Sequence, residues 1–447
     1  MASFLVGCSS EEPPAEKDSA ETPEEHRVAD RSKPNLVFIL IDDLDARLLQ
    51  NHLEDYPSLQ HLAANGTTFE NAFVTNPVCC PSRATILRGQ YSHNHGTLTN
   101  APPRGGFEKF KALGREKSTV ATWLLSERYR TVLLGKYLNG KPPGYDPPGW
   151  EKVFGHGGAY HTDGLAAKAA EFIRRTKGKR RPFFIYLATR WPHWPADPAP
   201  RHADAFPGAR APRPPSFNEE EISDKPTWLR EQASLTSKEI EELDEFYRKR
   251  LQSMTAIDDL IERVVESLRY SGKLSNTYIV FTSDNGLLMG EHRLGNAKDV
   301  AYEESIRVPL IVRGPGVPEG QTLKHLVLNN DFAPTFADLS GAKTPSFVDG
   351  RSLVPLLSED PPSSSDWRSA FLVENYEGYE YRAIRTKDRL WVEYTNGERE
   401  LYDLREDPNE LTSLHESASD NLKQNLSSRL GELRYCSREG CRKAEGF

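Results

Sequence analysis

Hydrophobic positions along the chain predict buried strands that alternate with amphipathic helices. The first apolar run, residues 36–41, is continuous and of strand length, as is typical of a strand buried on both faces of a parallel sheet. Further strands are predicted at residues 131–134, 183–187, 278–282 and 308–312. Apolar residues at helical spacing predict helices at residues 56–64, 119–127 and 236–269. This alternation is typical of an α/β fold with a mainly parallel sheet between helices.

The pattern changes after a Ser/Pro-rich stretch at residues 358–366, which indicates a domain boundary. Strands are then predicted at residues 370–374, 381–386, 390–394 and 401–404, with the hairpin signal Asn396-Gly397 between the last two. A helix over residues 418–434 closes the chain. We therefore predict a large domain over residues 34–365 that carries the candidate site, and a small α+β domain over residues 366–447.

The N-terminal residues 1–33 read as a leader followed by a linker. Residues 11–32 hold eight acidic and three basic residues with no aromatic residue, a composition that cannot form a core. Leu5-Val6-Gly7-Cys8 resembles a bacterial lipobox, in which Cys8 would carry a lipid anchor, although the apolar stretch before it is shorter than the ~7–15 residues of a secretory signal. We expect a truncated lipoprotein signal and an extracytoplasmic, membrane-anchored protein. A chance match and a cytoplasmic location are the alternative.

The overall charge argues against nucleic acid as a partner. The net charge is −8, so the chain offers no general basic surface to a polyanion. The most basic segment, residues 174–181, is predicted to be a solvated loop, with binding of nucleic acid or glycosaminoglycan as the less favoured alternative. An anionic substrate must therefore be attracted by local charge.

Four predicted strands lead directly to residues with useful chemistry. These are Asp42-Asp43, Lys136, His193 and Asp284-Asn285. Ligands of open α/β sheets bind outside the carboxyl ends of the strands, so we expect these side chains to converge. Asp42, Asp43, Asp284 and the amide oxygen of Asn285 form an all-oxygen set that suits a hard divalent cation, Ca²⁺ by preference with Mg²⁺ as the alternative. Asp258 and Asp259, in the long helix, are interpreted as surface carboxylates.

A second feature is the segment that begins with Cys79-Cys80-Pro81-Ser82-Arg83. Pro81 suits a first helical turn and Gly89 suits a helix end, so a helix is predicted over residues 82–88 with Cys79 just before it. Free N–H groups and the positive end of the helix dipole gather there, and Arg83 lies one turn on. The segment therefore predicts a binding site for an anion.

Cys79-x-Pro81-Ser82-Arg83, followed by Ala84 and, after four intervening residues, by Gly89, resembles the signature of the type I sulfatases. The resemblance implies that a formylglycine-generating enzyme oxidises Cys79 to Cα-formylglycine, whose hydrated aldehyde is the nucleophile. It also implies that Asp42, Asp43, Asp284 and Asn285 hold Ca²⁺ against residue 79 and a sulfate oxygen. The fold it implies is the alkaline-phosphatase-like sandwich, with a large mixed sheet between helices and a smaller C-terminal antiparallel sheet plus helix.

The same resemblance assigns roles to the cationic residues. Lys136, Lys298 and Arg83 match the family's cationic positions, and His193 matches the histidine of its Pro-His-x-Pro motif. By analogy, one hydroxyl of the hydrated formylglycine attacks sulfur while His193, assisted by Lys298, protonates the leaving oxygen. The second hydroxyl then expels the sulfate, and Arg83 holds the formylglycine in place.

One departure from the pattern points to a branch of the family. Many arylsulfatases carry Gly-Lys-Trp-His-Leu-Gly where this chain has Gly-Lys-Tyr-Leu-Asn-Gly at residues 135–140, so the histidine of that motif is replaced by Leu138. The version found here resembles the N-acetylglucosamine-6-sulfatase and heparan 6-O-endosulfatase branch, as do His93-Asn94-His95 and residues 224–228 and 248–250. The resemblance implies a sulfated carbohydrate, such as a 6-sulfated N-acetylglucosamine, or an aryl sulfate as substrate. His95 is interpreted either as a substrate contact or as a loop histidine.

Three alternatives remain open at this stage. Related folds use similar chemistry on phosphorus, so the chain could be a phosphodiesterase or phosphonate hydrolase. If Cys79 is not oxidised, the chain could be a catalytically silent glycan-binding protein. Cys436 and Cys441 enclose a short turn and are interpreted as either a disulfide or two exposed thiols.

Overall fold

An eight-stranded sheet forms the centre of the computed structural model, which describes residues 1–4, 7, 33–155 and 160–446. Its strand order is β11-β2-β10-β7-β1-β6-β4-β5. The strands are β1 (Asn35–Ile41), β2 (Thr67–Phe69), β4 (Arg130–Gly135), β5 (Lys152–Phe154), β6 (Phe183–Ala188), β7 (Thr277–Ser283), β10 (Leu310–Arg313) and β11 (Gln321–Leu323). β10 pairs antiparallel with both of its neighbours, and the other pairings are parallel. The predicted mixed, mainly parallel sheet is therefore confirmed.

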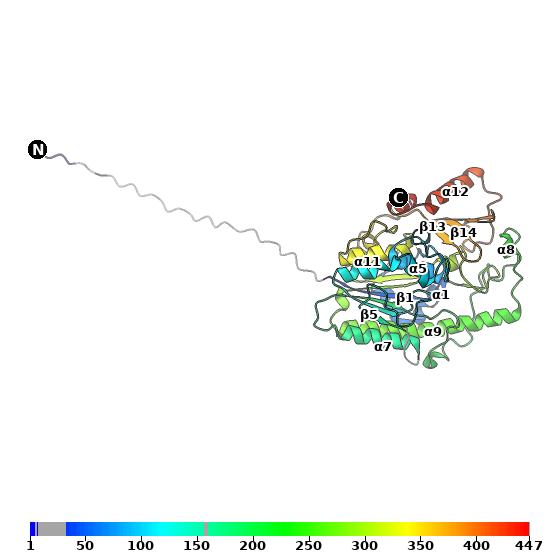
Figure 1. Cartoon of the computed structure of the whole chain (residues 1–447), viewed down its shortest axis with the longest axis horizontal. Helices are drawn as coiled ribbons and strands as arrows, with labels where there is room; N and C mark the ends of the chain where they lie inside the picture. Colours follow the sequence, from blue (N-terminus) through cyan, green and yellow to red (C-terminus); the bar gives the residue numbers. More distant parts are fainter. Residues whose placement is uncertain (5–6, 8–32, 156–159, 447) are drawn as a thin grey trace. The chain divides into compact units, whose positions relative to one another are not determined.

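Helices cover both faces of this sheet, with α5 and α11 on one side and α7 and α9 on the other (Figure 1). The helices of the chain are α1 (Ala46–His52), α2 (Pro57–Ala64), α3 (Cys79–Arg88), α4 (Ser92–His95), α5 (Gly106–Ala112), α6 (Val120–Ser126), α7 (His161–Arg174), α8 (Thr227–Arg230), α9 (Ser237–Tyr270), α10 (Glu303–Ile306), α11 (Phe332–Ser340), α12 (Asp420–Arg434) and α13 (Glu439–Ala444).

Strand β1 shows why this arrangement buries both faces. Leu36, Phe38 and Leu40 point into the core shared with α3, α6 and α11. The alternate residues Val37, Ile39 and Ile41 join the core shared with α2, α7 and α9. Side chains alternate between the two faces of a strand, so an unbroken apolar run is what a strand between two helical layers requires.

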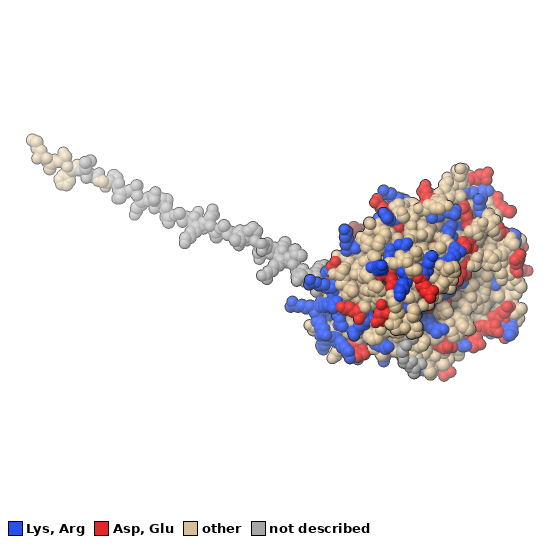
Figure 2. All heavy atoms as spheres, in the orientation of Figure 1, with Lys and Arg blue, Asp and Glu red and all other residues tan. Residues whose placement is uncertain are grey.

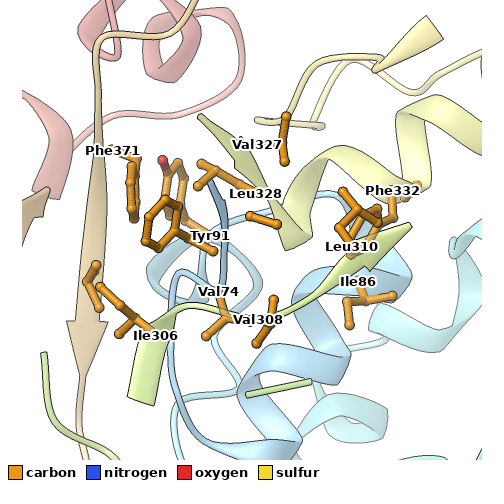
Figure 3. Close-up of a cluster of buried hydrophobic side chains, with 14 of the residues drawn as sticks. Val74, Ile86, Tyr91, Ile306, Val308, Leu310, Val327, Leu328, Phe332 and Phe371 are labelled. Atoms are coloured by element: carbon orange, nitrogen blue, oxygen red, sulfur yellow. The ribbon is translucent and has the colours of Figure 1, made fainter. Parts of the chain in front are cut away.

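A second, antiparallel sheet follows, made of β13 (Ala370–Asn375), β14 (Tyr381–Thr386), β15 (Arg389–Tyr394) and β16 (Arg399–Asp403). Its side chains share a hydrophobic core with one face of the eight-stranded sheet. The ring centroids of Phe371 on β13 and of Phe73 lie 4.9 Å apart. Figure 3 shows Phe371 facing the cluster that includes Tyr91, Leu328 and Val74. The smaller sheet and helix α12 confirm the predicted C-terminal elements, while the boundary near residue 366 stays a prediction.

Two further pairs of very short strands lie outside these sheets in the described part of the chain. β3 (Ala72–Phe73) pairs with β12 (Val327–Leu328), and β8 (Leu288–Met289) pairs with β9 (Asn296–Ala297). Cys436 and Cys441 form a disulfide, which selects one of the two interpretations of this pair.

Three sequence predictions concern the surface and the N-terminus. The Arg and Lys side chains of residues 174–181 are exposed, and Figure 2 shows basic side chains gathered at that end of the α7–α9 layer. The lipobox resemblance at Leu5–Cys8 and the acidic linker at 11–32 fall largely outside the described residues. Among the residues that the structure describes, no helix is both long enough and apolar enough to cross a bilayer.

Candidate active site

Two neighbouring parallel strands place the four predicted oxygen ligands side by side. β1 ends at Ile41 and β7 ends at Ser283, and these two residues are paired in the sheet register. Asp42-Asp43 and Asp284-Asn285 therefore leave the sheet at the same edge, as the strand pattern predicts. The backbone N–H of Asp43 donates to Asp284 Oδ1 at 3.2 Å, which holds the two segments together.

Asp43 has an unusual backbone conformation for a residue with a side chain. Its φ is 63°, in the left-handed region that Asp adopts more readily than most residues. This turn directs the carboxylate back toward the site, where Oδ1 accepts a hydrogen bond from Asn285 Nδ2 at 2.7 Å. Asp42, Asp284 and Asn285 are fully buried, and Asp43 is nearly so. Buried carboxylates and strained backbone conformations are typical of functional sites.

Helix α3 brings Cys79 to the same point. The Cys79 thiol lies 3.5 Å from Asp42 Oδ1 and 3.9 Å from Asp43 Oδ1. The helix starts at Cys79, three residues before the predicted start, and Pro81 is its third residue. Proline is tolerated there because the first N–H groups of a helix have no acceptor within it. Gly89 ends the helix at a φ of 67°, as predicted.

Arg83 lies fully buried one turn along α3. Its Nε donates to Asp284 Oδ2 at 2.6 Å, and Nη1 donates to the backbone oxygen of Lys136 at 3.0 Å. Nη2 lies 3.7 Å from Asp42 Oδ2. Arg83 therefore connects the ends of β1, β4 and β7, and its charge balances the buried acids.

Two lysines approach from other segments. Lys136, just after β4, places its Nζ 2.6 Å from Asp42 Oδ2. Lys298, just after β9, forms an ion pair with Asp43 and places its Nζ 2.9 Å from the Sγ of Cys79. Each lysine side chain keeps slightly under one fifth of its surface exposed, so both ammonium groups border the solvent side of the site.

His193 lies at the more open side, with one third of its side chain exposed. Its Nε2 is 3.7 Å from Asp43 Oδ2, and its Nδ1 donates to the backbone oxygen of Trp194 at 2.7 Å. This hydrogen bond orients the ring and leaves Nε2 to exchange a proton with a bound molecule. The structure thus brings together every residue predicted for the site.

Burial and the opposing charges shift several pKa values. Burial raises the pKa of the Cys79 thiol to about 12, against the effect of Lys136 and Lys298. Burial also raises the pKa of Asp284, to about 6, although Arg83 opposes this. At Asp42 burial is outweighed by Lys136 and Arg83, which together hold the pKa of that carboxyl well below its usual range. An unmodified Cys79 is therefore a neutral thiol at pH 7 and a poor nucleophile.

The donor set fits a hard divalent cation. Among the described residues, the buried Oδ1 of Asn285 has no hydrogen-bond partner, so it remains available as a ligand. One ligand atom from each of Asp42, Asp43, Cys79 and His193 lies within 4.8 Å of those of the other three. Carboxylate and amide oxygens suit Ca²⁺ better than zinc.

Sequence reasoning missed the role of Arg250 on α9. This side chain is fully buried, and its Nη2 donates to the backbone oxygen of Asp43 at 2.6 Å and to Asp45 Oδ2 at 2.9 Å. Asp45 in turn caps α1 by accepting the N–H of Leu48 at 2.7 Å. A signal existed, because Arg250 lies one helical turn before Met254 and two before Ile257, on the apolar face of α9.

Two sequence interpretations need correction. His95 is fully buried, its Nε2 is 3.0 Å from Thr85 Oγ1 and its Nδ1 accepts the N–H of Thr97 at 3.1 Å, so the substrate-contact alternative is wrong. Asp258 is a buried carboxylate, since it accepts the N–H groups of Ser58 and Leu59 at the start of α2. Asp259 is partly exposed and pairs with Arg201, as expected of a surface carboxylate.

Comparisons with known proteins agree with this geometry. A family model described as sulfatase matches residues 34–342, and one described as N-sulphoglucosamine sulphohydrolase, C-terminal, matches residues 290–435. An arylsulfatase of Volvox carteri is 32% identical, over 92% of this chain and 76% of that protein. The human N-acetylglucosamine-6-sulfatase is 34% identical, over 92% of this chain and 86% of that protein.

Solved structures show the same fold. A structure described as a complex with its substrate D-glucosamine-2-N,6-O-disulfate has a TM-score of 0.78 and 25% identity, covering 90% of this chain and 97% of that one. A phosphonate monoester hydrolase of Silicibacter pomeroyi has a TM-score of 0.69 at 22% identity, covering 88% of this chain and 93% of that one. At this identity the similarity shows a shared fold and nothing about the reaction. Because a family model spans most of its length and relatives above 30% identity cover nine tenths of it, the chain belongs to the sulfatase family of sulfuric ester hydrolases.

Proposed function

We propose that this sulfatase hydrolyses the sulfate ester of a sulfated carbohydrate, such as a 6-sulfated N-acetylglucosamine. The observation that carries the proposal is the position of Cys79, whose Sγ lies 2.9 Å from Lys298 Nζ and within 4 Å of both Asp42 and Asp43. The sugar is supported by similarity to N-acetylglucosamine-6-sulfatases and by the Tyr-Leu-Asn motif at residues 137–139.

The charges at the site fit an anionic substrate once a cation is bound. Three carboxylates face three cationic side chains, so the ionised groups of the protein sum to zero; they are Asp42, Asp43 and Asp284 against Arg83, Lys136 and Lys298. A bound Ca²⁺ would supply a net positive charge that polarises the S–O bonds of a sulfate ester. Asp42, Asp43, Asp284 and Asn285 would hold this ion.

The proposed nucleophile is Cα-formylglycine at position 79, produced from Cys79 by a formylglycine-generating enzyme with an external oxidant. This group would supply a hydrated aldehyde oxygen, which the buried neutral thiol cannot replace. Position 79 lies at the N-terminus of α3, so free backbone N–H groups and the helix dipole favour the negative charge of a bound sulfate there.

The remaining residues hold the sulfate group and move protons. Lys136 and Lys298 present ammonium groups to the sulfate oxygens on which charge increases during reaction. When His193 is protonated, its Nε2–H can be given to the leaving sugar oxygen, because the opposite nitrogen is fixed by the backbone oxygen of Trp194. Arg83 keeps Asp284 ionised and in place.

Two measurements on one preparation test this proposal. The purified protein is digested and the peptide containing residue 79 is weighed, and sulfate release is measured on a panel of defined sulfated mono- and disaccharides. We expect the aldehyde mass and release from a 6-sulfated glucosamine derivative. An unmodified thiol without sulfate release would contradict the mechanism, and sugar binding without turnover would support a silent glycan-binding protein instead.

A phosphorus substrate is the second candidate, because phosphonate monoester hydrolases share the fold. Matched phenyl sulfate, phenyl phosphonate and phosphate diester substrates separate the two. We expect the larger kcat/KM on the sulfate, and a strong preference for phosphorus would overturn the proposal.

We also propose that the protein is an extracytoplasmic lipoprotein attached to the membrane through Cys8. The support is the lipobox-like Leu5–Cys8 sequence followed by the acidic residues 11–32. Labelling cells with a fatty-acid analogue would detect the anchor, and a Cys8→Ser variant should lose the label. An unlabelled protein in the cytoplasmic fraction would contradict this location.

A further inference from the structure

A buried group of one histidine and two glutamates lies apart from the residues of the active site. His292 belongs to the β8–β9 segment, Glu304 to α10 and Glu410 to the loop before α12. Each residue is at most 6% exposed. One ligand atom of each lies within 4.8 Å of those of the other two, so three distant parts of the chain converge on one point.

Each of these side chains brings one unsatisfied atom to the group. Among the described residues, His292 Nε2, Glu304 Oε2 and Glu410 Oε1 are buried and have no hydrogen-bond partner. Their other polar atoms are paired: Glu304 Oε1 lies 2.7 Å from Arg47 Nη2, and Glu410 Oε2 accepts the N–H of Glu303 at 3.0 Å. Buried polar atoms are nearly always paired, so one unpaired atom on each of three side chains that converge indicates a bound partner.

The state of His292 fits a metal ligand. Its Nδ1 lies 2.7 Å from Glu219 Oε2, and a carboxylate there accepts a hydrogen bond from the ring Nδ1–H. With this hydrogen on Nδ1, a neutral imidazole has its lone pair on Nε2, the atom that has no hydrogen-bond partner among the described residues. A carboxylate behind a histidine is the arrangement that orients metal-binding histidines in proteins. Stacking on Tyr302, with the ring centroids 4.1 Å apart, fixes the plane of the imidazole.

The charges around the group leave room for a divalent cation. Four buried glutamates lie in and around this group: Glu219, Glu291, Glu304 and Glu410. In the described part of the chain, Arg47 and Lys225 are the only arginine or lysine residues that form ion pairs with them. If all four are ionised, the local sum is two negative charges. Burying uncompensated charge is costly, and one divalent ion would remove the excess.

We propose that His292, Glu304 and Glu410 bind a divalent transition-metal ion, zinc being the best match, with Glu219 as the residue that orients His292. One imidazole nitrogen and two carboxylate oxygens suit a borderline ion better than calcium. Two atoms bound to a tetrahedral zinc at about 2.0–2.2 Å are about 3.3–3.6 Å apart, so ligand atoms that now lie within 4.8 Å of one another would move closer by up to about 1.5 Å as the ion binds.

The location gives this ion a role for the active site. The backbone N–H of Gly286, next to Asn285, donates to the Ser305 oxygen on α10 at 2.8 Å. Lys298 directly follows β9, the strand after His292. An ion that joins His292 to Glu304 therefore fixes the segment that carries both Asn285 and Lys298.

The metal content of the full-length protein tests the proposal. The protein is produced with added zinc, dialysed against metal-free buffer and analysed by plasma mass spectrometry. We expect about one zinc per chain in the unmodified protein and less than about 0.1 in His292→Ala. The Asp284→Ala variant is the matched control, since it should lose calcium and keep zinc. This separates the second site from the proposed active-site ion.

The proposal stays testable if His292→Ala does not fold. Glu410→Gln keeps the volume of the side chain and should also lose zinc, and X-ray absorption on the unmodified protein should show nitrogen and oxygen ligands without sulfur. Less than about 0.1 transition-metal ion per unmodified chain would overturn the proposal and leave a proton shared between the two carboxyls. Zinc that persists in both variants, or sulfur in its ligand shell, would also overturn it.

Discussion

The guanidinium of Arg250 donates to the backbone oxygen of Asp43 at 2.6 Å and to the Asp45 carboxylate at 2.9 Å. These bonds hold the left-handed turn that directs Asp43 into the site. Arg250→Met should therefore weaken calcium binding about 10–100-fold, as is typical when a residue supporting a ligand is lost. Activity measured against added calcium would show this.

Lys249→Met is the matched control for this change, because Lys249 directly precedes Arg250 in α9 and pairs with Glu245 at the partly exposed surface. It should leave the calcium dependence unchanged. If Arg250→Met folds normally and binds calcium as tightly as the unmodified protein, Arg250 does not support the ligand turn.

Lys298→Met should lower kcat by about 10²–10³-fold, because the ammonium group beside residue 79 would stabilise negative charge on the sulfate in the transition state. Sulfate release under saturating substrate measures the effect. Lys324→Met, at a lysine whose side chain is 72% exposed, is the control. A loss smaller than about fivefold with normal formylglycine content would argue against this role.

Trp194 offers an aromatic surface beside His193, with 60% of the residue exposed. Sugar rings pack on such faces, so Trp194→Ala should raise KM for a sulfated saccharide about 5–50-fold and change KM for a small aryl sulfate much less. Initial rates on both substrates give the comparison. Tyr270→Ala, equally exposed at the opposite end of the strands, should change neither value.

The sequence patterns predicted much of the fold and the site because the informative residues lie at strand ends. An apolar run that stops at Asp42, and another that stops before Asp284, determine both the strands and the edge at which the acids meet. The pairing of β1 with β7, which makes these two ends neighbours, is a tertiary choice that neither segment encodes alone.

The interpretations that failed depend on partners distant in the sequence. Asp258 looks like a surface residue of α9, yet it binds the first N–H groups of α2, some 200 positions earlier. His95 resembles a loop histidine or a ligand contact until Thr85 and Thr97 are seen to satisfy both ring nitrogens. The sequence alone does not show whether a carboxylate or an imidazole faces water or a buried hydrogen-bond donor.

The pair formed by His93 and Glu374 joins helix α4 to strand β13 of the smaller sheet, with Nδ1 and Oε2 3.0 Å apart. Burial opposes the charge on His93, but Glu374 outweighs it and raises the pKa of His93 to about 9. Because this value exceeds the usual 6.5, the stabilisation is fully present below about pH 6.5 and is lost as the pH rises through about 9. The pKa of Glu374 is lowered from 4.5 to about 2, so its contribution is fully present above about pH 4.5 and is lost as the pH falls through about 2.

His93→Gln should therefore destabilise the protein by about 1–3 kcal/mol at pH 6 and by much less at pH 10. Melting temperatures of both proteins across this range, compared as differences, measure the effect and cancel the titration of other groups. His61→Gln, at an exposed histidine of α2, is the control. A difference between His93→Gln and the unmodified protein that is equal at pH 6 and pH 10 would mean that the ion pair contributes nothing and that only the shape of the ring matters.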